Sequence, residues 1–312
     1  MSRVVGVFSG KGGVGKTTLV ANLGAAMTNV FNKNAVIFDM NVHTSHLGLY
    51  FGLYEDMPVT LRDVMKKRVP LTNALYIHPT TGVRIIPAPL NGTDLVLTKN
   101  LCCNMVDKIK DNYDMVLLDC APGLGREVLA PMCTVDEAIV ISTPDIISLA
   151  DAIKTIEILK KLDKKVLGIV LNRYRNERYE LTPQEVQSTT NTNVISIIPE
   201  DGNVPNSISK GMPTVLSYPY SKSSIAFKKL AAMMSNERYE EETIIDKLMR
   251  ILNLRQKKTE RPIVQQQVIK SEASDLTSMK TELLANIKDE LKAELKKKVK
   301  KRLMERLNGK IA

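Results

Sequence analysis

Short apolar runs alternate with segments of helical periodicity over the first 235 residues of the chain. The apolar runs predict strands near residues 4–8, 35–39, 84–87, 115–119, 138–142, 166–171 and 194–197. The helical pattern predicts helices near residues 16–31, 61–67, 94–111, 126–132, 148–162, 182–190 and 221–234. Strands that are apolar throughout are typical of a parallel sheet covered by helices on both faces. The pattern therefore predicts an α/β fold for residues 1–235, with ligands bound at the carboxyl ends of the strands.

The loop after the first predicted strand is rich in glycine. It reads Gly10, Lys11, Gly12, Gly13, Val14, Gly15, Lys16, Thr17 and Thr18. This string matches the phosphate-binding pattern G-x-x-x-x-G-K-[ST], with a strand before it and a helix after it. Glycines let the backbone N–H groups turn toward phosphate oxygens, and the helix N-terminus adds the positive end of its dipole. We expect Lys16 to reach the β- and γ-phosphates of a nucleotide and the Thr17 hydroxyl to bind Mg²⁺.

A second lysine, Lys11, stands in the same loop, and residues 11–18 resemble the deviant P-loop of the MinD/ParA family of ATPases. The resemblance implies the P-loop NTPase fold, with ATP and Mg²⁺ as ligands and residues 10–18 as the main ATP contacts. It also implies a homodimer that forms with ATP, in which Lys11 reaches the phosphates bound by the other subunit.

Two of the predicted strands end on an aspartate, Asp39 and Asp119. An acid at the end of a strand beside a P-loop can hold the Mg²⁺ shell. The segments that follow resemble the two switch segments of the family, which implies a Mg²⁺ site made by Thr17, Asp39 and Asp119. The expected catalytic residues are Lys11, Lys16, Asp39 and Asn41.

Asn41 departs from the family pattern, because the first switch segment usually carries a second aspartate there, which orients the attacking water. An amide can hydrogen-bond a water molecule but cannot accept its proton. Since hydrolysis at a P-loop depends mostly on positioning and electrostatics, the change need not abolish turnover. The sequence therefore predicts an ATPase that hydrolyses ATP slowly.

Two further positions are expected to contact the adenine base. Asn172 follows the strand predicted at 166–171, and its amide can both donate to and accept from a purine edge. An asparagine at this place reads the adenine amino group in the family. Residues 198–201 resemble the family's loop that packs against the base, which implies a contact with Pro199. Residues 209–213 match the last family element, so the resemblance covers about residues 2–234.

The composition is that of a soluble globular protein, with 44% hydrophobic and 25% charged residues among 312. No apolar run approaches the roughly 18–20 residues of a membrane span, and a strand predicted from residue 4 leaves no room for a signal peptide. The four cysteines show no C-x-x-C spacing, so we interpret them as reduced thiols in a cytosolic protein.

The net charge of +10 is concentrated near the end of the chain. From residue 253 onward there are 16 Lys and Arg against 8 Asp and Glu, a net charge of +8, which leaves +2 for all preceding residues. Residues 236–254 predict an amphipathic helix, which is either a membrane-targeting helix or a last helix packed on the core. Residues 255–274 read as a linker, and residues 275–308 as one long basic amphipathic helix.

A basic amphipathic helix is typical of a segment that binds anionic lipid, but the same charges would bind DNA phosphates, and a solvated helix or partner coil remains an alternative. The leading hypothesis is a MinD-like spatial switch. Its ATP-dependent dimer would bind the inner face of the cell membrane reversibly from the cytoplasm, position a division site or other structure, and respond to an activating protein partner. The rival is a ParA-like partitioning ATPase that binds DNA. An iron–sulfur assembly ATPase is disfavoured because the C-x-x-C of the superfamily's iron–sulfur carriers is missing.

Overall fold

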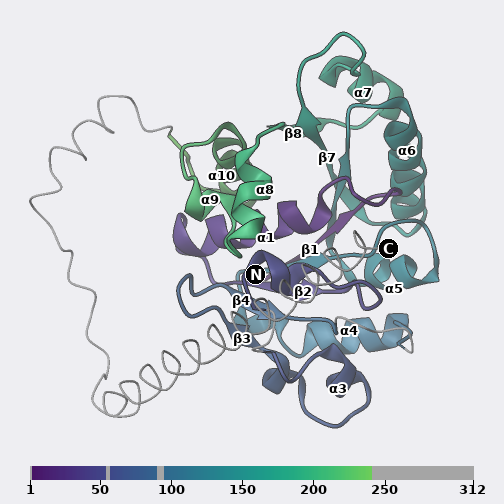
Figure 1. The fold of residues 1–312 in the computed structure, drawn as a ribbon. Helices are drawn as coiled ribbons and strands as arrows, with labels where there is room; N and C mark the ends of the chain where they lie inside the picture. The colour runs from purple at the N-terminus through teal and green to yellow at the C-terminus, as the bar shows by residue number, and fades with distance from the viewer. Residues whose placement is uncertain (1, 54–56, 90–94, 241–312) are drawn as a thin grey trace, which may run out of the picture. The chain divides into compact units, whose positions relative to one another are not determined.

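The computed structural model describes residues 2–53, 57–89 and 95–240, and within them one eight-stranded sheet forms the centre of the fold (Figure 1). The strands are β1 (Arg3–Phe8), β2 (Ala35–Asp39), β3 (Tyr76–Ile77), β4 (Arg84–Ile86), β5 (Met115–Asp119), β6 (Glu137–Ser142), β7 (Lys165–Tyr174) and β8 (Val194–Pro199). They lie in the order β3-β4-β2-β5-β1-β6-β7-β8. Neighbouring strands pair in parallel except β3 and β4, which are antiparallel. The mostly parallel sheet predicted from the sequence is confirmed.

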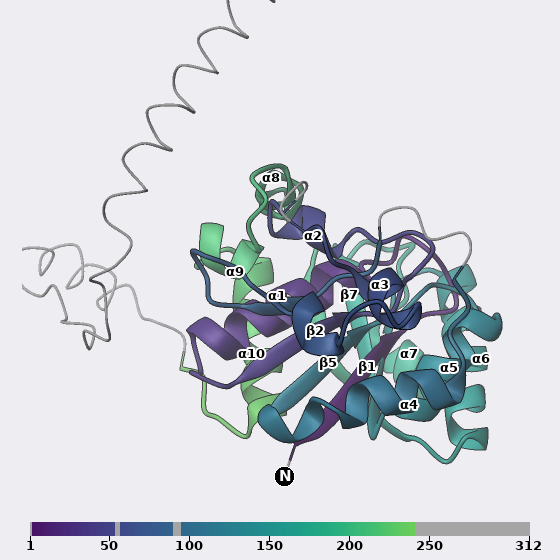
Figure 2. The same ribbon diagram turned by 90° about the horizontal axis from the view of Figure 1, so that it is seen from below.

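Helices cover both faces of this sheet. The helical segments are α1 (Lys16–Asn29), α2 (Leu47–Tyr50), α3 (Leu61–Met65), η1 (Leu71–Ala74), α4 (Lys99–Asp107), η2 (Lys110–Asn112), α5 (Arg126–Thr134), α6 (Ile146–Lys161), α7 (Pro183–Thr190), α8 (Asn203–Ser209), α9 (Thr214–Ser217) and α10 (Lys222–Ser235). Figure 2 shows α1, α9 and α10 on one side of the sheet and α4, α5 and α6 on the other. Two buried apolar clusters match these two sides.

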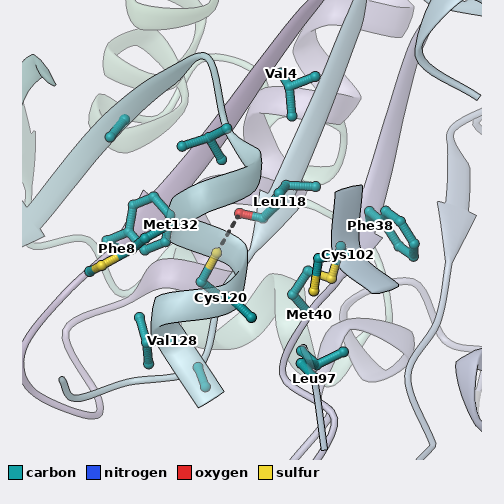
Figure 3. Packing of buried hydrophobic residues seen from close by; sticks show 14 of the residues in the cluster. Val4, Phe8, Phe38, Met40, Leu97, Cys102, Leu118, Cys120, Val128 and Met132 are labelled. Atoms are coloured by element: carbon teal, nitrogen blue, oxygen red, sulfur yellow. Dashed lines mark hydrogen bonds between the residues drawn. The ribbon is translucent and has the colours of Figure 1, made fainter. Parts of the chain in front are cut away.

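The first strand shows how one short sequence serves both clusters. Along β1, Val4 and Phe8 belong to the cluster that α4, α5 and α6 complete, whereas Val5 and Val7 belong to the cluster that α1 and α10 complete. Successive side chains of a strand point to opposite faces, so a strand covered on both faces must be apolar at every position. Figure 3 shows part of the first cluster, with side chains from β1, β2, β5, α4 and α5.

Side chains placed at the helix starts fix where several helices begin. The Asp145 carboxylate accepts a hydrogen bond of 2.9 Å from the Ser148 backbone N–H at the start of α6. Thr182 and Glu185 form a reciprocal capping box at the start of α7. Each such cap satisfies backbone N–H groups that have no partner within the helix, and typically contributes about 1 kcal/mol.

The structure corrects several predicted boundaries. The helix predicted at 94–111 is shorter, because α4 begins after the Thr98 cap and ends at Asp107, and the 3₁₀ turn η2 follows. Strand β7 extends to Tyr174 and β8 to Pro199, so Asn172 lies within β7 and Pro199 ends β8, and neither lies in a loop. The short elements β3, α2, α8 and α9 were not predicted, because each carries too little periodicity to stand out in the sequence.

Two glycines bring α2 and α8 together. Gly211, which follows α8, has a φ of +61°, and a Cβ atom there would lie 2.5 Å from the Cα atom of Gly52, just after α2. Gly52 also has a positive φ. Because a Cβ atom would collide with backbone here, the two loops can touch only if Gly211 has no side chain.

The predicted amphipathic helix at 236–254, the linker at 255–274 and the long basic helix at 275–308 lie outside the described residues from position 241 onward. Residues 236–240 are described and are not helical. Within the described part of the chain, none of the helices has the length and apolar character needed to cross a membrane.

Candidate active site

The glycine-rich loop joins β1, a central strand of the sheet, to α1. Gly13 and Gly15 have φ values of +78° and +102°, in the left-handed region that favours glycine. A Cβ atom at Gly15 would lie 2.3 Å from Nδ2 of Asn172, and that amide donates a 2.7 Å hydrogen bond to the Val14 carbonyl oxygen. The amide of Asn172 therefore holds the loop in the conformation from which α1 begins at Lys16.

Lys16 is buried with only 7% of its surface exposed. Its Nζ donates to Oγ of Ser9 over 2.6 Å, and that hydroxyl donates to the Lys11 carbonyl oxygen over 2.7 Å. Burial lowers the pKa of Lys16, and the nearby carboxylate of Asp119 opposes this effect. Lys16 is thus a desolvated amine fixed by the loop itself, and such a group interacts strongly with an anion.

Two buried aspartates lie beside this lysine. Asp39 and Asp119 end the neighbouring strands β2 and β5 and are register partners in the parallel pairing. Burial, together with the charge of Asp119, raises the pKa of Asp39 to about 8, against hydrogen bonds from Ser45 and the Asn41 backbone. Burial also raises the pKa of Asp119 to about 6, although Thr17 and Lys16 lower it. Two carboxylates this close and this desolvated repel each other unless a proton or a cation lies with them.

The oxygen atoms of the pair differ in their hydrogen bonding. Asp39 accepts from the Ser45 hydroxyl at 2.6 Å and from the Asn41 N–H at 2.9 Å. In contrast, Oδ1 of Asp119 is buried and has no hydrogen-bond partner among the described residues. A buried carboxylate oxygen without a partner, next to the Thr17 hydroxyl, fits a hard divalent cation such as Mg²⁺. The residues predicted to hold Mg²⁺ are therefore brought together by the fold.

A cleft of about 470 Å³ opens beside Lys16 and Thr17. It is lined by Gly13, Gly15, Lys16, Thr17, Thr18, Asn41, Thr44, His46, Leu49, Tyr50, Cys120, Pro122, Arg173 and Ile208. Of the predicted site residues, those from the end of the glycine-rich loop and Asn41 line it. The other predicted site residues do not line it, namely Gly10, Lys11, Gly12, Val14, Asp39, Asp119, Asn172 and Pro199.

Asn41 is held by its own loop. Its Nδ2 donates to the Thr44 carbonyl oxygen over 2.8 Å, and its Oδ1 accepts from the Thr44 hydroxyl over 3.2 Å. The side-chain amide thus has hydrogen bonds at both its nitrogen and its oxygen. An amide in this position can orient a polar molecule in the cleft only by sharing or exchanging these bonds.

Lys11 is exposed, in contrast to the buried Lys16. Its charge acts on Asp145, the cap of α6. Burial raises the pKa of the Asp145 carboxyl. Hydrogen bonds from Thr143 and Ser148, together with the charge of Lys11, outweigh burial and lower that pKa overall. An exposed lysine at the rim of the loop is free to meet groups outside this cleft.

Two residues that line the cleft, Tyr50 and Arg173, were not predicted from the sequence. The Tyr50 hydroxyl forms a 2.9 Å hydrogen bond with the hydroxyl of Thr18, and Arg173 lies at the end of β7. The only signal for Arg173 was its place directly after Asn172. Nothing in the local pattern singled out Tyr50.

The sequence of the core matches a known protein family. A ParA model, described as an NUBPL iron-transfer P-loop NTPase, matches residues 1–235. The chain belongs to the ParA family. An uncharacterised ATP-binding protein of Methanocaldococcus jannaschii is 35% identical over 241 residues, which cover 77% of this chain and 90% of that protein.

Solved structures of cell-division ATPases share the family fold. The MinD of Pyrococcus furiosus superposes with a TM-score of 0.70 at 30% identity and covers 76% of this chain and 99% of that one. The septum site-determining MinD of Pyrococcus horikoshii, in a complex with Mg-ADP, gives 0.70 at 31% identity and covers 75% and 96%. The resemblance to MinD/ParA ATPases stated from the glycine-rich loop is therefore confirmed, and the chain is a member of a family of P-loop ATPases.

Proposed function

We propose that this chain is a MinD-like ATPase that acts as a spatial switch. The observation that supports this proposal best is the acidic pair Asp39 and Asp119 at the ends of β2 and β5, with Asp119 close to the buried amine of Lys16. One amine for phosphate and two acids for a cation, grouped at one sheet edge, suit the binding and hydrolysis of ATP with Mg²⁺.

The residues of the chain have separate tasks in this mechanism. The backbone N–H groups of residues 10–18 bind the phosphates, and Lys16 stabilises the charge that develops on the transferred phosphoryl group. Thr17, Asp39 and Asp119 would hold Mg²⁺, which neutralises phosphate charge when bound. Asn172 and Pro199 contact the adenine once the nucleotide has entered.

Lys11 completes the site of a second copy of the chain. Its exposure at the rim, away from its own cleft, supports a role across a homodimer that forms with ATP. Hydrolysis then dissolves the dimer. Nucleotide state thereby controls whether two copies of the C-terminal segment act together, and two weak membrane anchors on one particle bind far more tightly than one.

Asn41 sets the speed of the switch. We expect Asn41→Asp to hydrolyse ATP about tenfold faster than the wild type, because a carboxylate can accept the proton that an amide cannot. The measurement is steady-state phosphate release at saturating Mg-ATP. Asn41→Ala is the matched control, because alanine can neither hydrogen-bond the water nor accept its proton. Equal rates for the wild type and Asn41→Asp would refute slow hydrolysis through Asn41.

The target of the basic C-terminal segment is tested by sedimentation. We expect the full chain to pellet with anionic liposomes in the presence of ATP and to stay in solution with ADP. Removal of residues 241–312 should abolish pelleting and leave ATP binding intact, because the described core ends before them. The same experiment with plasmid DNA tests the rival: ATP-dependent DNA binding without lipid binding would favour a ParA-like partitioning ATPase.

The proposal also includes an activating protein partner that speeds hydrolysis. It locates the protein in the cytoplasm and on the inner face of the cell membrane. The iron–sulfur alternative stays a prediction of lower rank. Across residues 2–53, 57–89 and 95–240, no group of three or more His, Cys, Asp or Glu side chains is arranged to hold a metal ion.

A further inference from the structure

The cleft has two chemically different ends, divided by the adjacent threonines of the glycine-rich loop. Thr17 contacts the carboxylate of Asp119, at the end that would hold the cation. The next residue, Thr18, bonds the Tyr50 hydroxyl, at the other end. There the walls also include Ile208 and Arg173. A phenol, an aliphatic side chain and a guanidinium suit a flat ring, and they do not suit a metal ion.

The backbone at Arg173 is unusual. Its φ is +60°, in the left-handed region that non-glycine residues rarely adopt. The pairing of β7 with β8 shifts its register between Asn172 and Tyr174, on either side of Arg173. Such a bulge redirects the side chain of the extra residue, and bulges are frequent next to binding sites. The distortion turns Arg173 into the lining of the cleft.

The fold itself makes little use of this arginine. Arg173 is exposed, and its guanidinium forms no hydrogen bond or ion pair with any residue of the described ranges. A left-handed arginine costs free energy that no contact of its own offsets. Strain held at a cleft wall, on a side chain without a structural partner, indicates that the partner is a ligand.

Tyr50 and Arg173 interact electrostatically at the wall of the cleft. Burial raises the pKa of the Tyr50 phenol, and the Thr18 hydrogen bond lowers it; beyond these, Asp119 raises it and Arg173 lowers it. The guanidinium is therefore close enough to act on the phenol, and both side chains line the cleft. Thr18, which bonds Tyr50, follows the phosphate-binding Lys16 and Thr17 in the loop, so this end of the cleft is where the nucleoside of a bound nucleotide would lie.

We propose that Arg173 is a nucleoside-binding residue, whose planar guanidinium stacks on the purine ring of bound ATP at the Tyr50 end of the cleft. This inference rests on the proposed function, because it requires that the cleft binds ATP. It adds a stacking contact from β7 to the edge contact proposed for the neighbouring Asn172, whose Nδ2 also donates to the Val14 carbonyl oxygen. Stacking on a base supplies affinity for a purine without contacting the phosphates.

The test measures Mg-ATP and Mg-tripolyphosphate binding to the full chain by calorimetry. The central variant is Arg173→Asn, since asparagine tolerates the left-handed backbone and removes the guanidinium. We expect the Kd for ATP to rise about tenfold, while the Kd for tripolyphosphate stays that of the wild type. Arg173→Lys keeps the charge but not the plane, so its Kd for ATP should rise at least threefold or so.

The matched control is Arg175→Asn, an exposed arginine two residues further on that does not line the cleft, and it should bind ATP as the wild type does. Unchanged ATP affinity in Arg173→Asn, or full affinity in Arg173→Lys, would overturn the stacking role. An equal loss for ATP and tripolyphosphate would also overturn it, because Arg173 would then bind phosphate. These results leave the proposed ATPase standing, whereas a wild type that binds no ATP removes both.

Discussion

Lys16→Ala is expected to lower the rate of ATP hydrolysis by about 10²–10³-fold, the loss typical for one preorganised group that stabilises developing charge. The effect should be this large because the amine is buried and already fixed by Ser9, so it acts on phosphate charge without reorganising. The measurement is phosphate release from Mg-ATP at saturation. Circular dichroism and thermal unfolding of the same samples show whether the variant has folded.

Lys154→Ala is the matched control for Lys16→Ala. Lys154 lies on α6 with 64% of its side chain exposed, and its ion pair with Asp151 spans 3.9 Å. An exposed pair of this kind contributes little to stability or to the site, so the control should retain the wild-type rate. If Lys16→Ala keeps more than a tenth or so of the rate, Lys16 is not the lysine that stabilises the phosphoryl group.

Asp119→Asn is expected to have opposite effects on activity and on stability. Hydrolysis should fall by about a hundredfold or more, because the amide weakens the Mg²⁺ site. In contrast, the protein without nucleotide or Mg²⁺ should become more stable at pH 8, by roughly 1–3 kcal/mol, since one of two buried like charges is gone. Thermal unfolding in EDTA measures the second effect. A destabilised Asp119→Asn would contradict the repulsion between the two carboxylates.

The pH dependence follows from the same pair. The folded-state pKa values of Asp39 and Asp119 are raised from 3.8 to about 8 and about 6, so the folded chain holds more protons than the unfolded chain in this window. Stability from these groups is fully present below about pH 3.8, decreases as the pH rises, and is lost above about pH 8. Asp119→Asn should flatten this decline, and added Mg²⁺ should reverse part of it.

Local sequence predicted the parts of the site that depend on local structure. The glycine-rich loop carries its conformation in its own residues, and the apolar strands end on Asp39 and Asp119. Parallel strands end at one edge of a sheet, so the meeting of the two acids could also be anticipated. The structure adds that they are register partners.

The remaining features depend on contacts between distant segments. The bulge that redirects Arg173 exists only in the pairing of β7 with β8, and Asn172 reaches a loop 158 residues earlier in the chain. Tyr50 ends a helix of four residues, which is too short for any periodic signal. Tertiary pairing decides these positions, and a local pattern does not contain it.

The close approach of Gly52 and Gly211 has a mechanical consequence. Because their backbones touch without side chains between them, α2, which carries Tyr50, and α8, which carries Ile208, are joined at one stiff point. We therefore expect α2 and α8 to shift together. If ATP binds as proposed, we expect a displacement of residues 39–49 on phosphate release to reach α8 through this contact, without passing through the core.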